Sequence, residues 1–194
     1  MKSFKHIVSG IALVFLVFTL TGCNVTTERW AYNHETDKEI LALSSNGKAV
    51  FKNNKYKYTK DDSFINLTDK DGNTTSLRYY MDGDAMVLYE SSTYQYAGEG
   101  EPDGVVGIWL QDNNWSYQFN ADGKFSEDNI FYGFYSVDEA NSSIKLMYDE
   151  PLQDAILYYH LNGNELTIEY PWTLVHLTDK DDAVIDNGTQ TGQK

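Results

Sequence analysis

Apolar and polar side chains alternate over short runs along most of the chain, and turn-forming residues separate these runs. Residues 77–88 (LRYYMDGDAMVL) show the pattern clearly, with two alternating runs that meet at Asp82-Gly83. A period of two is typical of a strand with one buried face, and Asp-Gly between two such runs is a strong hairpin signal. Beyond residue 24 no stretch keeps the 3.6-residue period of a helix over three turns, so the pattern predicts an all-β protein.

The pattern occurs twice, at a spacing of about 79 residues. Residues 157–168 (LYYHLNGNELTI) match residues 77–88, with Asn162-Gly163 at the second turn. Spacings drift where insertions fall in turns, while strands keep their register. The sequence therefore predicts two copies of one antiparallel meander. Further matched pairs keep the same order: Trp30 with Trp109, Asn46-Gly47-Lys48 with Asp122-Gly123-Lys124, Tyr58 with Tyr135, Ile65 with Ile144, and Leu67 with Leu146.

These repeats suggest a division into a first β repeat at residues 24–96 and a second at 105–178. Residues 91–107 are rich in glycine and acids and predict a connection, with 97–104 as the linker. The polar segment 179–194 is expected to be a disordered tail. Because one repeat barely supplies a sufficient core, we expect two small barrels or sheets packed together. The alternative is one continuous β-barrel that uses both copies.

The N-terminus has the order of an export signal over residues 1–22: a basic start, then an apolar run at residues 7–20. That run is about 14 residues long, shorter than the roughly 20 that a bilayer-spanning helix needs. The following residues, Leu20-Thr21-Gly22-Cys23, resemble the lipobox of bacterial lipoprotein precursors. The resemblance implies cleavage before Cys23 and a diacylglyceryl group on its sulfur, with palmitate-type acylation.

The count of cysteines agrees with this interpretation. Cys23 is the only cysteine of the chain, so it has no disulfide partner within it. Two acyl chains anchor a protein stably, without a transmembrane helix. We therefore expect a lipid-anchored extracytoplasmic protein at the bacterial cell membrane.

The second copy resembles the small lipocalin-like β-domains of bacterial lipoproteins. The resemblance covers residues 105–177 well and 28–90 loosely, and it implies a fold and a cellular location without an activity. Its motifs are a strand-turn-strand and a late hairpin, carried by Tyr117, Phe119, Asp122, Gly123 and Phe125, and by Leu161, Gly163, Asn164, Leu166, Ile168 and Tyr170.

Charge excludes one class of partner. The chain has 29 acidic and 15 basic residues, a formal net charge of −14. Nucleic-acid binding depends on Lys and Arg that displace counterions, so a field of this sign repels phosphates. We expect no nucleic-acid partner.

Catalytic and cofactor motifs are missing from the sequence. There is no G-x-S-x-G elbow, and His34, His160 and His176 have no zinc-ligand spacing. Acidic residues are so many that no catalytic pair stands out. The sequence predicts a protein that is not an enzyme and has no cofactor.

One loop resembles the first half of a calcium site. Asp69, Asp71 and Asn73 place three oxygen-bearing side chains at alternate positions, but the distal Glu of such a loop is replaced by Tyr80. A hairpin turn explains the same residues, and whether they bind a cation stays open.

Adjacent tyrosines are the candidate ligand contacts. In the pairs Tyr79-Tyr80 and Tyr158-Tyr159, neighbouring strand residues must point to opposite faces. Core filling and cross-strand packing explain part of this pattern. An exposed tyrosine also offers a large contact area with a polar tip.

Together these features predict a non-enzymatic module that binds or screens a peptide, a glycan or a protein at the cell surface. The alternatives are a structural or interaction module of an envelope complex and a bacteriocin-type immunity lipoprotein.

Overall fold

A computed structural model describes residues 25–112 and 116–178, which form antiparallel strands and one short 3-10 turn. Every strand pairs with its neighbour in the chain, and the first strand also pairs with the last, so the sheet closes. The predicted all-β meander is confirmed. Residues 1–22, Cys23 and the tail 179–194 lie outside the described residues.

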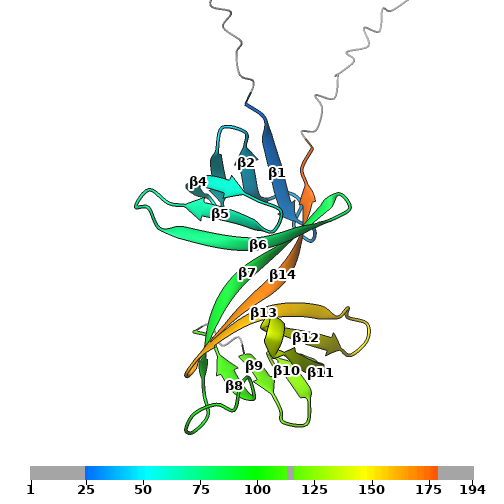
Figure 1. Cartoon of the computed structure of the whole chain (residues 1–194). Helices are drawn as coiled ribbons and strands as arrows, with labels where there is room; N and C mark the ends of the chain where they lie inside the picture. The colour runs from blue at the N-terminus through cyan, green and yellow to red at the C-terminus, as the bar shows by residue number, and fades with distance from the viewer. Residues whose placement is uncertain (1–24, 113–115, 179–194) are drawn as a thin grey trace, which may run out of the picture.

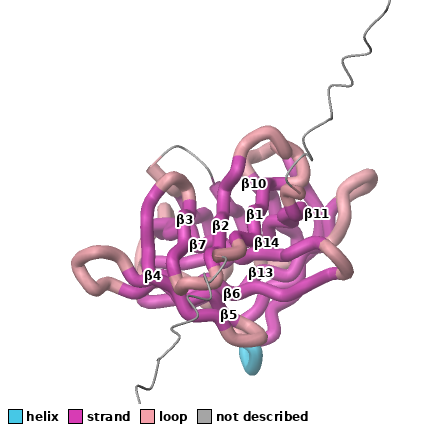
Figure 2. Tube along the Cα trace, turned by 90° about the horizontal axis from the view of Figure 1, so that it is seen from above, coloured by secondary structure: helices cyan, strands magenta, loops and turns pink. Residues whose placement is uncertain are grey.

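The strands of the first copy are β1 (Thr27–Tyr32), β2 (Glu39–Ser44), β3 (Lys48–Phe51), β4 (Asn54–Lys60), β5 (Phe64–Thr68), β6 (Thr74–Asp82) and β7 (Ala85–Tyr96). Those of the second are β8 (Gly107–Leu110), β9 (Ser116–Phe119), β10 (Lys124–Glu127), β11 (Phe131–Asp138), β12 (Ser143–Tyr148), β13 (Ala155–Asn162) and β14 (Glu165–His176). The turn η1 (Glu139–Asn141) lies between β11 and β12 and projects from the edge of the molecule in the view from above (Figure 2). No helix within the described part of the chain has the length and hydrophobicity needed to span a bilayer.

The long strands β7 and β14 pair with each other and divide the closed sheet into two parts (Figure 1). We call the part closed by β1–β6 the first unit and the part closed by β8–β13 the second unit. Each unit uses one half of β7 and one half of β14. The two units lie at opposite ends of this pair of strands.

One face of the β7/β14 ribbon lines both cores. Met86 and Leu88 of β7 are buried in the first core, and Tyr94 of the same strand is buried in the second. On β14, Leu174 belongs to the first core and Leu166 to the second. These positions differ by even numbers, so side chains on a single face of the strands enter both interiors.

The remaining core residues come from within each unit. Those of the first core are Trp30, Ile40, Leu41, Leu43, Ala49, Ile65, Leu67, Leu77 and Tyr79. Those of the second are Val105, Trp109, Tyr117, Phe119, Phe125, Ile144, Leu146 and Leu157, and Ile168 of β14 joins them next to Leu166.

Between the units β14 changes its second neighbour. Glu169 pairs with Tyr158 of β13, whereas Leu174 pairs with Tyr32 of β1. Pro171 lies between these two pairings, where the ladder continues only with β7. Proline has no N–H to donate to a neighbouring strand. A long strand therefore tolerates proline at this position, where it has a paired neighbour on one side only.

The outer face of the ribbon is fixed by contacts between the units. The Arg78 guanidinium of β6 lies 3.9 Å from the ring centroid of Tyr158, and its Nε is 3.0 Å from Glu169 Oε2. Tyr89, on the same face, packs edge-on against Tyr158 with 5.2 Å between centroids. A two-stranded ribbon twists easily on its own, so these contacts hold the units at one angle.

The connection between the copies is shorter than the glycine- and acid-rich segment 91–107. Residues 91–96, included in the predicted connection, are strand and continue β7 from the first core to the second. The segment 97–104 joins β7 to β8, which pair directly at Tyr96 and Trp109. Polar composition misled the prediction because the outward face of the ribbon is polar. Whether either copy folds alone stays a prediction.

Both late hairpins are confirmed, but each turn is displaced by one residue. Asp82 pairs with Ala85, and Asn162 pairs with Glu165, so the two-residue loops begin at the glycine. Gly83 has φ 60 and Gly163 has φ 57, while the residues that follow them have no positive φ. A positive φ at the first loop position alone is the pattern of a type II′ turn.

Leu174→Ala should destabilise the first unit although its strand belongs to the second copy. Removing this fully buried side chain should cost about 2–5 kcal/mol of unfolding free energy. Chemical denaturation measures the loss, and amide exchange should show weaker protection in the first unit. Thr173→Ala, at an exposed neighbouring position, is the control. Unchanged exchange in β1–β6 would contradict the shared-strand packing.

Candidate functional site

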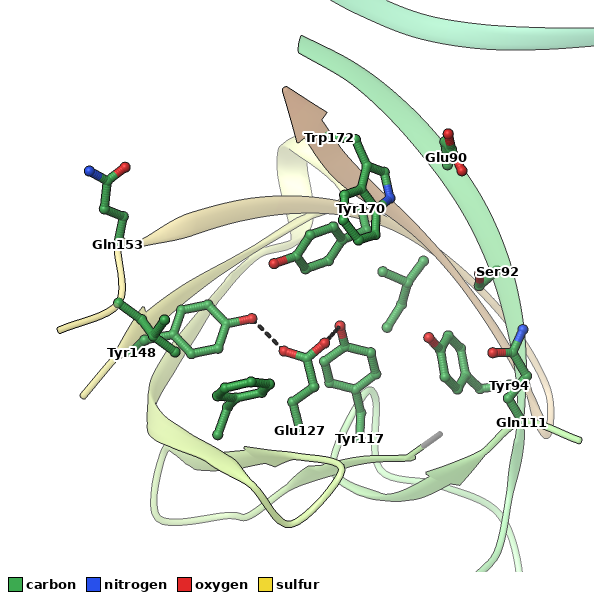
Figure 3. Close-up of a pocket in the computed structure, with 13 residues that line it drawn as sticks. Glu90, Ser92, Tyr94, Gln111, Tyr117, Glu127, Tyr148, Gln153, Tyr170 and Trp172 are labelled. Atoms are coloured by element: carbon green, nitrogen blue, oxygen red, sulfur yellow. Dashed lines mark hydrogen bonds between the residues drawn. The ribbon is translucent and has the colours of Figure 1, made fainter. Parts of the chain in front are cut away.

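A cavity of about 670 Å³ opens in the second unit, on the inner face of the β7/β14 ribbon (Figure 3). Six of its thirteen lining residues are aromatic, and the others include two carboxylates and two amides. The lining residues are Glu90, Ser92, Tyr94, Gln111, Tyr117, Glu127, Phe131, Tyr148, Leu152, Gln153, Ile168, Tyr170 and Trp172.

Glu127, at the end of β10, is the chemical centre of this cavity. Its side chain points inward and the residue is only 8% exposed. Tyr117 donates its hydroxyl to Oε1 at 2.8 Å, and Tyr148 donates to Oε2 at 2.6 Å. Both carboxylate oxygens therefore accept a hydrogen bond from a phenol.

Strand register brings these three side chains together. Glu127 pairs with Tyr117 across β9 and β10, so both side chains lie on the same face. Tyr148 reaches them from β12 over Gly133, which is its partner on β11. A Cβ at Gly133 would lie 2.1 Å from the backbone oxygen of Met147. Glycine has no Cβ, and beside it the rings of Phe125 and Tyr148 pack edge-on with 5.1 Å between their centroids.

The phenols of this cluster are held in their protonated form. Burial, together with the charge of Glu127, raises the pKa of Tyr117 and of Tyr148 well above the ordinary value of 10.0. Burial, and then the same charge, raises the pKa of Tyr94 to about 12. At neutral pH these tyrosines are therefore hydrogen-bond donors.

Side chains from the first unit contact residues at the rim of the cavity. The rings of Tyr170 and Trp172 lie 5.3 Å apart on β14, and Tyr32 packs against Trp172 at 5.5 Å. Glu90 of the lining accepts the hydroxyl of Tyr32 at 2.5 Å and forms an ion pair with Lys52. The charge of Glu90 is therefore balanced by a lysine of the first unit.

The positions that correspond to Tyr117 and Glu127 in the first unit are apolar. Leu41 pairs with Phe51 across β2 and β3, as Tyr117 pairs with Glu127 across β9 and β10. Leu41 is fully buried, and Phe51 packs against the first core. The same meander therefore closes without a buried carboxylate.

None of the four predicted ligand-contact tyrosines lines the cavity. Tyr79 is buried in the first core and donates its hydroxyl to the carbonyl oxygen of Asp61 at 2.5 Å, while Tyr80 is 48% exposed. Tyr158 contacts Arg78 on the outer face, and Tyr159 packs against the second core. Their contact with a ligand stays a prediction.

The loop that resembles half a calcium site is a hydrogen-bonded turn. Asp69 Oδ1 accepts the backbone N–H groups of Asp71 at 2.8 Å and of Asn73 at 2.9 Å. Its second oxygen accepts the side-chain amide of Asn73 at 3.0 Å. Over residues 25–112 and 116–178, no group of three His, Cys, Asp or Glu is placed to hold a metal ion.

Sequence reasoning missed Glu127 because it is one of 29 acidic residues. The repeat contained a usable signal, since Glu127 follows Asp122-Gly123-Lys124 as Phe51 follows Asn46-Gly47-Lys48. An acid at a core-facing position that is aromatic in the other copy is a candidate for a functional role.

The raised tyrosine pKa values predict alkaline loss of stability. A group whose pKa is higher in the folded state than in the unfolded state makes its full contribution to stability below the unfolded-state pKa, here about 10. That contribution is lost as the pH rises through the pKa of the folded state. Unfolding free energy should therefore decline above about pH 10. Tyrosinate absorbance should show Tyr117 and Tyr148 ionising after the exposed tyrosines.

Glu127→Gln tests the electrostatic part of this shift, because it removes the charge and retains the shape. Both phenols should ionise at lower pH than in the unaltered protein, while still above 10 because they remain buried. Glu101→Gln, an exposed loop substitution, should leave the titration unchanged. Identical titrations for both variants would show that Glu127 has no influence on the phenols.

Comparisons with protein-family models, curated protein sequences and solved structures gave no match. The function of this chain is therefore inferred from its own geometry, in which the buried Glu127 in an aromatic cavity distinguishes the second unit from the first.

Proposed function

We propose that this protein is a bacterial surface lipoprotein that binds a small polar ligand in the cavity of the second unit, without chemical conversion of that ligand. The observation that carries the proposal is the Glu127 carboxylate at the centre of the cavity, with Tyr117 and Tyr148 bound to its oxygens.

Stability is a poor explanation for this carboxylate. Removing a charged group from water is costly, and replacing buried ionic groups by well-packed apolar residues is often neutral or stabilising. The first unit has that apolar solution, with Leu41 and Phe51 at the equivalent positions. A costly group in one copy alone is better explained by what it binds.

The cavity has the size and composition of a small-molecule site. Its volume of about 670 Å³ lies within the roughly 300–1,000 Å³ of ligand pockets, which combine apolar walls with a few placed polar groups. Covalent catalysis needs a nucleophile next to a base. The lining residues described here include Ser92 but no His, Cys or Lys, which favours binding over catalysis.

The path of the chain suits an anchor at Cys23. Trp30 of β1 pairs with His176 of β14, and the Leu177 N–H donates to the Arg29 carbonyl oxygen at 2.7 Å. The chain thus enters and leaves at the end of the first unit, away from the second (Figure 1). A lipid on Cys23 would hold the first unit near the membrane and present the cavity outward.

A second candidate function, an interaction module of an envelope complex, is favoured by one observation. On β11 of the second unit Tyr132 is 50% and Phe134 is 52% exposed. The equivalent strand of the first unit, β4, has Lys55 and Lys57 at these positions. Crosslinking in cells separates the candidates, because a stoichiometric membrane partner would favour the module and a small molecule would favour binding.

Cys23→Ala should abolish lipidation. Metabolic labelling with a fatty-acid analogue should mark the unaltered protein and leave the variant unmarked, because the chain has no other cysteine to accept a diacylglyceryl group. The variant should also move from the membrane fraction to the soluble fraction. Equal labelling of the two proteins would contradict the lipoprotein proposal.

Ser92→Phe should block the cavity. Ser92 lines it, and the position that matches Ser92 in the other long strand is Trp172, so the ribbon accommodates a large ring there. In amide NMR spectra a panel of amines, neutral sugars and dipeptides should shift cavity residues of the unaltered protein, and the variant should lose these shifts. Thr93→Phe, on the opposite ribbon face, is the matched control. Shifts that survive Ser92→Phe would place binding elsewhere.

A further inference from the structure

The two carboxylates of the cavity differ in how their charge is balanced. Glu90 pairs with Lys52 and accepts the hydroxyl of Tyr32. Among the described residues, the side-chain donors that the Glu127 carboxylate accepts are the neutral phenols of Tyr117 and Tyr148. No Lys, Arg or His of the described residues forms an ion pair with Glu127, so its negative charge is buried and has no counter-charge.

The hydrogen bonds to Glu127 leave room for a further donor. An ionised carboxylate has about four lone-pair sites, and the two phenols use one on each oxygen. A bond from a cationic N–H to a carboxylate is roughly twice as strong as one between neutral groups. A cation in the cavity would therefore add the balancing charge that the fold does not provide.

Aromatic rings surround the open side of this carboxylate. Tyr94, Tyr170 and Trp172 line the cavity together with the two phenols bound to Glu127 (Figure 3). The face of an aromatic ring carries partial negative charge and attracts a cation within about 6 Å of its centroid. Carboxylate and rings thus favour the same kind of ligand.

The charge of the whole chain acts in the same direction. A net charge of −14 attracts cations to the surface and repels anions. A neutral sugar could stack on the rings, but it would leave the buried charge of Glu127 without a counter-charge. The geometry therefore discriminates against both anionic and neutral ligands.

We infer that the ligand carries an ammonium group, which the Glu127 carboxylate binds while Tyr94, Tyr170 and Trp172 surround it. This inference rests on the proposed binding function and adds the chemical class of the ligand. Two sources share this chemistry: a primary amine, which donates hydrogen bonds to the carboxylate, and a quaternary ammonium, which relies on charge and ring faces.

Matched pairs of probes test the charge and separate the two sources. Choline is compared with 3,3-dimethylbutan-1-ol, its neutral isostere, and n-butylamine with n-butanol, by calorimetry and amide NMR on the full folded domain. In at least one pair the cation should bind about tenfold or more tightly than the neutral member, equivalent to about 1.4 kcal/mol. The larger preference identifies the quaternary or the primary amine as the source.

Two substitutions locate the effect. Glu127→Gln should remove the preference for the charged member of each pair, and its amide spectrum reports whether the fold is retained. Tyr148→Phe keeps the carboxylate and should keep the preference for the cation. The test therefore does not depend on the Glu127→Gln variant alone. Glu101→Gln removes an exposed charge outside the cavity lining and should change the affinity by less than about twofold, because exposed charges are screened by salt.

Equal affinities within both pairs would overturn the inference. Loss of the preference in Glu101→Gln to the same extent as in Glu127→Gln would also overturn it, since the effect would then be one of overall charge. If neutral probes shift cavity residues and Ser92→Phe abolishes those shifts, the binding function stands while the ammonium assignment fails. If no probe of either kind shifts the cavity, both fail.

Discussion

Ten consecutive residue pairs between β7 and β14 are the constraint on which the rest of this fold depends. Without them β7 and β14 would be open edges in both units, with unpaired backbone groups that expose a sheet to aggregation. In the matched hairpins Leu88 corresponds to Ile168, and in the ribbon Glu90 pairs with its own counterpart, Tyr170. The ribbon is therefore nearly two-fold symmetric about that pair. Each copy contributes its last strand to the other, which accounts for two copies in one chain.

Departures from this symmetry concentrate where the cavity lies. At the centre of the ribbon the counterparts are Glu90 and Tyr170, and next to them Ser92 corresponds to Trp172. Ser92 and Trp172 both line the cavity, and the small serine leaves space there that a second ring would fill. Inside the units the same division holds, because Glu127 occupies the place of an aromatic residue. One copy keeps an apolar interior that supports the fold, and the other carries the polar group at a cost in stability.

Sequence patterns predicted the local parts of this structure and missed the non-local ones. Alternation and glycine turns identified the hairpins, because both signals act between residues that are close in the chain. The register of β7 against β14 joins residues about 80 positions apart, and no local pattern specifies it. The same limit explains why composition did not reveal that residues 91–96 continue β7 into the second core, since their outward positions are polar as in a loop. Glu127 was missed because its surroundings come from β9 and β12 as well as from its own strand.

The site also depends on the unit that does not contain it. Trp172 at the rim is packed by Tyr32, and Lys52 balances the charge of Glu90, so two residues of the first unit shape the opening in the second. A ligand that binds only the folded protein stabilises every element whose unfolding would destroy the site. Since β7 and β14 run through both cores, those elements include the first unit. Binding at the proposed site would thereby be coupled to the stability of the entire sheet, which neither copy could achieve with its own strands alone.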